Sequence, residues 1–214
     1  MRRSLFGSAL VRRATSALLL AAAAMASPAF GQARDITNAA DPYRHVGTST
    51  AFSLATGDFR RTKVAEYNAS GTDASATYDL IRGGEKLMSI TMYIYPMSAS
   101  TGPSERSALC RDEYAGIKGA ITRSPSYTNV SLRAEDLPGS PYAGVRAEGY
   151  HASYTFTSNF AGSTMKVRSD AYLYCSANGR WFVQYRATWP ATRTLEGDLF
   201  VFMAMMRWND SVSR

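Results

Sequence analysis

The chain contains little of the material from which catalytic and metal sites are usually built. It has two histidines and two cysteines in 214 residues, and neither histidine has a carboxylate or a cysteine at the spacing of a metal-ligand motif. Gly83 and Gly84 are not followed by the Lys-Ser/Thr pair that a nucleotide-binding loop requires. We therefore expect no zinc site, no other metal and no cofactor.

Positive charge is also scarce once the first 33 residues are set aside. The formal net charge of +7 includes four arginines from residues 1–33, a segment without any acidic residue, so its removal leaves +3. The remaining cations, such as those within residues 60–63 and 166–168, alternate with other residue types, as they do on solvated strand faces. We therefore expect no nucleic-acid partner.

Residues 1–33 have the pattern of a secretory signal peptide. Four arginines accompany an uncharged, Ala/Leu-rich stretch over residues 17–26, and Gly-Gln-Ala at 31–33 is a small-x-small cleavage site. The apolar stretch is shorter than the roughly 20 residues of a membrane span. We expect cleavage, no membrane span afterwards, and a periplasmic or secreted protein. Arg12 and Arg13 leave open whether the general secretory or the twin-arginine route is used.

The two cysteines, Cys110 and Cys175, agree with export. An even number of cysteines in an oxidising compartment is most simply one intramolecular disulfide. Two buried free thiols are the alternative. A catalytic dithiol is not expected, because neither cysteine belongs to a Cys-x-x-Cys motif.

Hydrophobic periodicity predicts a single α+β domain over residues 51–214, preceded by a flexible N-terminal arm over residues 34–50. The predicted strands cover residues 58–67, 74–80, 90–95, a short segment near Val130, about 145–156 and 165–176. A loop over residues 158–164 is predicted between the last two strands. We expect the strands to form an antiparallel, meandering sheet.

Two helices are predicted to pack on this sheet. The first follows Gly102-Pro103-Ser104, where proline suits a first helical turn. Its apolar stripe consists of Cys110, Tyr114, Ile117 and Ile121. The second helix covers about residues 192–208, and its stripe consists of Leu195, Leu199, Phe202, Met203 and Met206.

Asn178-Gly179 lies between two alternating runs and predicts a two-residue type I′ hairpin turn, which fixes the strand register. Counting outward pairs Cys175 with Phe182. One face then carries Tyr172, Tyr174, Trp181, Val183, Tyr185 and, farther along, Trp189; the other carries Leu173, Cys175 and Phe182. A disulfide to Cys110 would place the first helix over the second face, because disulfide Cβ atoms lie about 4 Å apart.

The candidate binding residues are Tyr172, Tyr174, Trp181, Tyr185 and His151. Stripes of tyrosine and tryptophan can bind sugars, peptides or other flat apolar groups, although such residues more often serve ordinary sheet packing. Whether the C-terminal helix covers this face or leaves a groove decides between the two. His151 is also a candidate general base, a role that would need a nearby nucleophile and an orienting acid. The alternative is that His151 is a hydrogen-bonded histidine or lies at the rim of the sheet.

The C-terminal pattern resembles a known type of protein. The stretch Arg-Trp-Phe-Val-Gln-Tyr-Arg-Ala-Thr-Trp-Pro over residues 180–190, followed by Met-Arg-Trp at 206–208, is similar to the end of small exported proteins of the PsbP-like fold. The resemblance covers residues 52–208. It implies an antiparallel sheet sandwiched by helices and a non-enzymatic accessory or binding role, and it carries over no functional residue.

Together these patterns favour an exported, soluble, non-catalytic accessory or binding protein of the bacterial cell envelope. Its partner is expected to be an envelope protein or a small ligand. Two alternatives are kept. One is a small exported hydrolase that uses His151, and the other is an envelope assembly or stress factor that binds a protein partner.

Overall fold

A computed structural model of the protein describes residues 33–99, 102–139, 147–176 and 178–208. All of these residues belong to one compact unit, Gly31–Arg214. The predicted signal peptide, apart from Ala33, lies outside the described residues. Residue 177 of the predicted hairpin turn also lies outside them.

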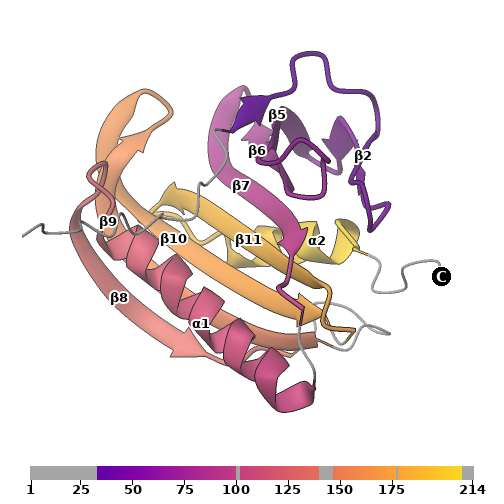
Figure 1. Ribbon diagram of the computed structural model, residues 1–214. Coiled ribbons are helices and arrows are strands. Elements are labelled where there is room, and N and C mark those ends of the chain that lie inside the picture. The colour runs from indigo at the N-terminus through magenta and orange to yellow at the C-terminus, as the bar shows by residue number, and fades with distance from the viewer. Residues whose placement is uncertain (1–32, 100–101, 140–146, 177, 209–214) are drawn as a thin grey trace, which may run out of the picture. The chain divides into compact units, whose positions relative to one another are not determined.

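The described residues form short and long strands and two helices (Figure 1). The strands are β1 (Arg34–Asp35), β2 (Tyr43–Arg44), β3 (Ala51–Phe52), β4 (Ala55–Thr56), β5 (Phe59–Glu66), β6 (Ala74–Arg82), β7 (Glu85–Pro96), β8 (Thr128–Asp136), β9 (Ala147–Phe160), β10 (Ser163–Ser176) and β11 (Trp181–Pro190). The helices are α1 (Pro103–Thr122) and α2 (Glu196–Met205).

The main sheet is built from two antiparallel meanders, and it is larger than predicted. Hydrogen-bonded neighbours follow the order β1-β5-β6-β7-β11-β10-β9-β8, with β4 paired to β5 outside this path. Strands β5 to β7 form one meander and β8 to β11 form the other. The two meanders join where β7 pairs with β11. The described residues thus form a mostly antiparallel sheet with two helices, an α+β arrangement.

Residues 34–50, predicted as a flexible arm, are instead held in place. β1 pairs with β5, and β2 pairs with β3 in a separate two-stranded sheet. The Arg61 guanidinium donates hydrogen bonds to the carbonyl oxygens of Ala39 and Ala40 at 3.0 and 2.9 Å, and His45 is buried. The sequence did not predict these pairings, because hydrogen bonds to distant residues leave no periodic signal in the sequence.

The β10–β11 hairpin has the predicted register, in which Cys175 pairs with Phe182 and Tyr172 with Tyr185. The turn differs from the prediction. Its closing backbone hydrogen bond runs from Gly179 N to Ser176 O at 2.9 Å, so the tight turn begins one residue earlier than a type I′ turn on Asn178-Gly179 would. The alternation of the flanking strands therefore sets the register even though the turn type is different.

The predicted loop over residues 158–164 is wrong. β9 continues to Phe160 and β10 begins at Ser163, so only Ala161 and Gly162 connect the two strands. Both have positive φ, 51° and 85°, as a type I′ turn requires. The strand ends carry polar residues because they are largely exposed here, and this polarity is what suggested a loop.

Helix α1 packs on one face of the sheet through the stripe that its spacing predicted. Cys110, Tyr114, Ile117 and Ile121 are its buried residues, and they share a core with β9, β10 and β11 side chains such as Leu173. Cys110 and Cys175 form the predicted disulfide, with their Cα atoms 6.1 Å apart. Figure 1 shows α1 lying across the β8–β11 part of the sheet.

Helix α2 packs on the opposite face of the sheet. It is shorter than predicted, because the chain first turns after β11, where Arg193 N donates to Pro190 O at 3.0 Å. The predicted apolar stripe is confirmed. Leu195, Leu199, Phe202, Met203 and Met206 are all buried in a core with the aromatic residues of β10 and β11.

Replacing Phe202 with alanine is expected to lower the free energy of unfolding by about 3–5 kcal/mol. The Phe202 ring is fully buried and lies 4.8 and 5.1 Å from the ring centroids of Phe59 and Tyr78. Phe200, in the same helix, is 54% exposed, and Phe200→Ala is expected to cost less than about 1 kcal/mol. Urea denaturation followed by tryptophan fluorescence measures both variants. Equal losses would contradict the orientation of α2.

Removing the disulfide by the double substitution Cys110→Ala and Cys175→Ala is expected to destabilise the protein by about 4 kcal/mol, because a bridge across 65 residues restricts the unfolded chain. The measurement is urea denaturation of the oxidised protein and of the double variant. Reductant should lower the stability of the first and leave the second unchanged. A loss below about 1 kcal/mol for the double variant would speak against this role of the bridge.

Candidate functional site

Four of the five residues predicted as a binding face belong to the core that α2 covers, and the fifth, His151, stacks on one of them. Tyr172, Tyr174, Trp181, Tyr185 and His151 are between 0 and 8% exposed. The Tyr172 ring stacks on His151 with centroids 4.1 Å apart, and Tyr174 lies 6.4 Å from Tyr172 and 6.2 Å from Tyr185. The ring of Trp181 meets the edge of His45 at 5.2 Å.

This aromatic face is covered, so the groove considered from the sequence is closed. Tyr185 OH donates to the backbone oxygen of Met206, just after α2, at 3.0 Å. Tyr172, Tyr174, Trp181 and Tyr185 belong to the same core as Leu199 and Phe202 of α2. The structure therefore gives these side chains a packing role, and a ligand-binding role for them stays a prediction.

His151 is the centre of a polar network at one side of this core. Its Nδ1 lies 3.1 Å from Asp136 Oδ2 at the end of β8. Its Nε2 lies 3.7 Å from Asp170 Oδ2, which is an ion-pair separation rather than a hydrogen bond. Arg168 donates to both oxygens of Asp170, at 3.1 and 3.2 Å, and also pairs with Glu196. The network thus joins β8, β9 and β10 to the first turn of α2.

The charges of this network shift the pKa values of His151 and Asp170. Burial opposes the charged form of His151, but the carboxylates of Asp170 and Asp136 outweigh it and raise the pKa of His151 above 6.5. Burial likewise opposes the ionised form of Asp170, yet the nearby His151 and the hydrogen bonds from Arg168 leave the pKa of Asp170 lowered. The folded protein therefore favours the positive form of His151 more strongly than a free imidazole does.

The sequence also suggested His151 as a general base, and the structure brings a serine and an acid close to it. Ser153 lies opposite Asp170 in the β9–β10 register. Both residues are 1% exposed, however, and Ser153 Oγ has no hydrogen-bond partner among the described residues. A serine nucleophile needs contact with its base and access to substrate. The arrangement fits a buried ion-pair network better than a hydrolase site.

His45, placed by the sequence in the arm, occupies a different environment. Its Nε2 lies 3.0 Å from the carbonyl oxygen of Thr72, and its Nδ1 lies 2.9 Å from Thr48 Oγ1. Burial lowers the pKa of His45, although backbone hydrogen bonding partly opposes this shift. The two histidines of the chain are therefore shifted in opposite directions.

The face of the sheet opposite α2 is covered by α1 only in part. The uncovered part carries a polar surface that the sequence analysis did not predict. We call it the polar face. Its residues are Ser75, Thr77 and Asp79 on β6, Ser89, Thr91 and Tyr93 on β7, and Gln184, Arg186 and Thr188 on β11. All are buried or half-buried. Their neighbours in each strand, such as Ile90 and Tyr185, lie in the core under α2, so the polar face is the reverse side of that core.

Hydroxyl groups link the strands across the polar face. Thr77 and Thr91 share a hydrogen bond at 3.0 Å. Ser89 donates to Asp79 at 2.8 Å, and Lys86 forms an ion pair with the same carboxylate oxygen at 2.8 Å. The negative charge of Asp79, the acidic residue of this face, is therefore already compensated.

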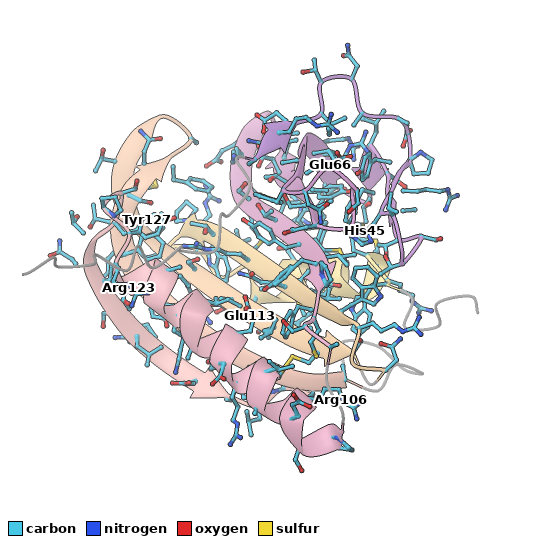
Figure 2. All side chains as sticks on the ribbon, in the orientation of Figure 1. His45, Glu66, Arg106, Glu113, Arg123 and Tyr127 are labelled. Atoms are coloured by element: carbon cyan, nitrogen blue, oxygen red, sulfur yellow. A yellow bond between two sulfur atoms is a disulfide. The ribbon has the colours of Figure 1, made fainter. Side chains whose placement is uncertain are left out.

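Aromatic residues border the polar face. The Tyr67 and Tyr93 rings lie 6.4 Å apart, and burial raises the pKa of Tyr93, an effect that the nearby Arg186 partly offsets. Tyr95 OH donates to Glu113 of α1 at 2.8 Å, which marks the border with the helix. Figure 2 labels Glu113 midway along α1 and Tyr127 beyond the end of the same helix.

Arg186 lies in the middle of the polar face. In the registers of β7 and β10 it lies between Thr91 and Ala171. Its guanidinium packs on the ring of Tyr127, 5.3 Å from the centroid. Its Nη2 is buried and has no hydrogen-bond partner among the described residues. The period-two run of polar residues in β7 and β11 is the signal that could have revealed this face.

Two shallow cavities lie elsewhere on the α1 side. One of about 360 Å³, at the start of α1, is lined by residues that include Arg106, Glu148 and Cys175. Ser107 and Tyr150 donate to the two oxygens of Glu148 at 2.7 and 2.6 Å, so this carboxylate already has partners. The other cavity, of about 240 Å³, lies beside Glu135, whose carboxylate pairs with Lys118 at 2.6 Å.

Comparison with known proteins does not place the chain in a family. No protein-family model matches the chain, and no curated protein matches it significantly. Among the described residues, no group of three or more His, Cys, Asp or Glu side chains is placed to hold a metal ion. Neither α1 nor α2 is long and apolar enough to cross a membrane.

The two histidines are expected to titrate on opposite sides of pH 6.5, with His45 below it and His151 above it. The raised pKa of His151 means that its contribution to stability is complete below the unfolded pKa of about 6.5 and is lost as the pH rises through the folded pKa. NMR titration gives both midpoints. Urea denaturation of the wild type and of His151→Gln should differ most below pH 6.5.

Asp136→Asn provides the matched test, because Asp136 is largely exposed and contacts His151 directly. This substitution should lower the His151 midpoint, whereas Asp112→Asn on the exposed side of α1 should leave it unchanged. An unshifted His151 in Asp136→Asn would contradict the assigned network.

Proposed function

We propose that the chain is an exported, non-catalytic accessory protein of the bacterial cell envelope that binds a ligand through the polar face. The leader-like residues 1–33 and the disulfide between Cys110 and Cys175 support export into an oxidising compartment. The periplasm or the exterior is the proposed location. Either site is reached after removal of the leader.

The observation that carries the binding role is the half-buried guanidinium of Arg186, whose Nη2 lacks a hydrogen-bond acceptor among the described residues. Buried donors are rarely left without partners, so an unsatisfied one points to a missing acceptor. The surrounding threonines, serines and tyrosines supply further donors and acceptors together with flat ring surfaces. This combination suits binding of a small molecule.

The resemblance to the PsbP-like fold supports an accessory role. That resemblance implies a sheet between helices, and in this chain α1 and α2 pack on opposite faces of one antiparallel sheet. Membership of the PsbP-like group is proposed on this pattern together with the C-terminal strand and helix. It implies no enzymatic activity and no particular ligand.

A second candidate is the assembly or stress factor that binds a protein partner. It is favoured by the outer side of α2, where Phe200, Val201 and Met205 are 54, 55 and 42% exposed. Exposed apolar residues in a group are typical of protein-binding surfaces. The two candidates use opposite faces of the sheet, so single substitutions separate them.

The test begins with protein recovered from its native host. The intact mass should correspond to a chain that starts at Arg34 and has no alkylatable thiol. Native mass spectrometry should then detect a bound small molecule in the wild type. Tyr93→Leu on the polar face should lose it, whereas Phe200→Ser on α2, the matched control, should retain it. A chain that binds no small molecule, or that loses it only in Phe200→Ser, contradicts the proposed binding surface.

The hydrolase alternative is tested on the same material. Wild type and His151→Ala are incubated with panels of esters, peptides and glycans. We expect no turnover by either protein, because Ser153 is not accessible to a substrate. Turnover by the wild type that disappears in a folded His151→Ala protein would replace the binding proposal with a catalytic one.

A further inference from the structure

We propose that Arg186 is the recognition residue for an organic anion, whose carboxylate pairs with the guanidinium while its flat apolar part lies against Tyr93. This inference rests on the proposed function and specifies the chemistry of the ligand. Four features of the polar face lead to it: the position of the charge, its missing counter-ion, the polar groups around it and the aromatic surfaces beside it.

Burying the positive charge of Arg186 costs free energy unless the guanidinium has a partner. Arginine stays protonated at every physiological pH, and a partly buried charge is stable only when it is paired or well hydrogen-bonded. Arg186 is half-buried, and its neighbours in the β7 and β10 registers are Thr91 and Ala171, neither of which carries a charge. The strand pairing therefore places a fixed cation between two uncharged neighbours.

Other half-buried arginines in this protein show how such a cation is usually compensated. Arg168 pairs with Asp170 and Glu196, and Arg61 donates to the backbone oxygens of Ala39 and Ala40. Arg186 differs from both. No carboxylate of the described residues forms an ion pair with it, and its guanidinium packs on the ring of Tyr127.

The acidic residue that belongs to the polar face already has other partners. Asp79 already accepts from Ser89 and pairs with Lys86, both at 2.8 Å. Glu113, at the border with α1, accepts from Tyr95. No acid of the described residues forms an ion pair with Arg186, so an anion from solution would be attracted to its guanidinium.

A carboxylate fits this environment well. The guanidinium offers several N–H donors in a plane, which match the two oxygens of a carboxylate. Thr91 lies beside Arg186 in the register, and its hydroxyl already takes part in a hydrogen bond with Thr77. Such a linked hydroxyl can add a further contact to a bound oxygen.

The aromatic surroundings select the remainder of the ligand. The Tyr127 ring contacts Arg186 and also stacks on Phe156 at 4.2 Å, so it is held in place. Tyr93, paired with Gln184 in the β7–β11 register, lies on the same face and is close to Tyr67. Rigid rings next to a cation favour a ligand that has both a flat apolar group and a negative charge.

The experiment uses benzoate as the probe and ¹⁵N-labelled mature protein. The Arg186 Nε–Hε resonance and the backbone amides of β7 and β11 are followed by NMR while sodium benzoate, acetate, phosphate or neutral benzamide is added at constant ionic strength. We expect saturable shifts with benzoate, weaker binding of acetate and phosphate, and roughly tenfold or weaker affinity for benzamide, which lacks the charge-assisted hydrogen bonds.

Three variants complete the design. Arg186→Met removes the charge and should weaken benzoate binding roughly tenfold or more. Arg133→Met is the matched control, because Arg133 is an exposed arginine on β8, and it should leave binding unchanged. If Arg186→Met does not fold, Arg186→Gln and the wild-type Arg186 resonance itself supply the result.

The outcomes separate this inference from the function on which it rests. Linear shifts of equal size at Arg186 and Arg133 would mean counter-ion condensation and would overturn the inference. Benzamide that binds as tightly as benzoate, with no effect of Arg186→Met, would also overturn it, while a small molecule retained from the native host would leave the binding function in place. Absence of any probe-induced shift on the polar face would count against the anion site.

Discussion

Strand alternation in β7 and β11 divides the side chains of the central sheet into two sets, and the positions of both helices depend on this division. Val183, Tyr185 and Ala187 point to one side and are sealed beneath α2. Gln184 and Arg186 point to the other side, where α1 covers only the neighbouring strands. A shift of one residue in the β7–β11 pairing would exchange the two sets. The apolar core and the polar face are therefore two results of one register.

The disulfide and the ion-pair network fasten the two helices to the sheet in different ways. Cys110 joins α1 covalently to Cys175 of β10. Glu196, in the first turn of α2, is held through Arg168, which also contacts Asp170. One helix is thus fixed by a bond that depends on oxidation, and the other by apolar packing and charges whose balance depends on pH.

Much of the fold could be read from the sequence because it depends on local periodicity. The spacing of Cys110, Tyr114 and Ile117 identified α1 and its buried side, and the alternation around Asn178-Gly179 gave the β10–β11 register. The segment 34–50 could not be read in this way, since contacts such as those of Arg61 join residues far apart in the chain. The candidate site was harder to predict from the sequence. Tyrosine-rich strands suggested a binding face under α2, yet burial assigns those rings to the core, and the unpaired Arg186 became apparent only when three strands were placed side by side.

The pairing of β1 with β5 has a consequence for the order of maturation. On the proposal that a leader is cleaved behind Ala33, Arg34 becomes the first residue of the chain, and it is part of β1, paired with Glu66. Proteases cut segments that are exposed and free of strand pairing. On the proposal that a leader is removed, cleavage would therefore have to precede the pairing of β1 with β5, so that Arg34 enters the edge of the sheet as a newly created chain end.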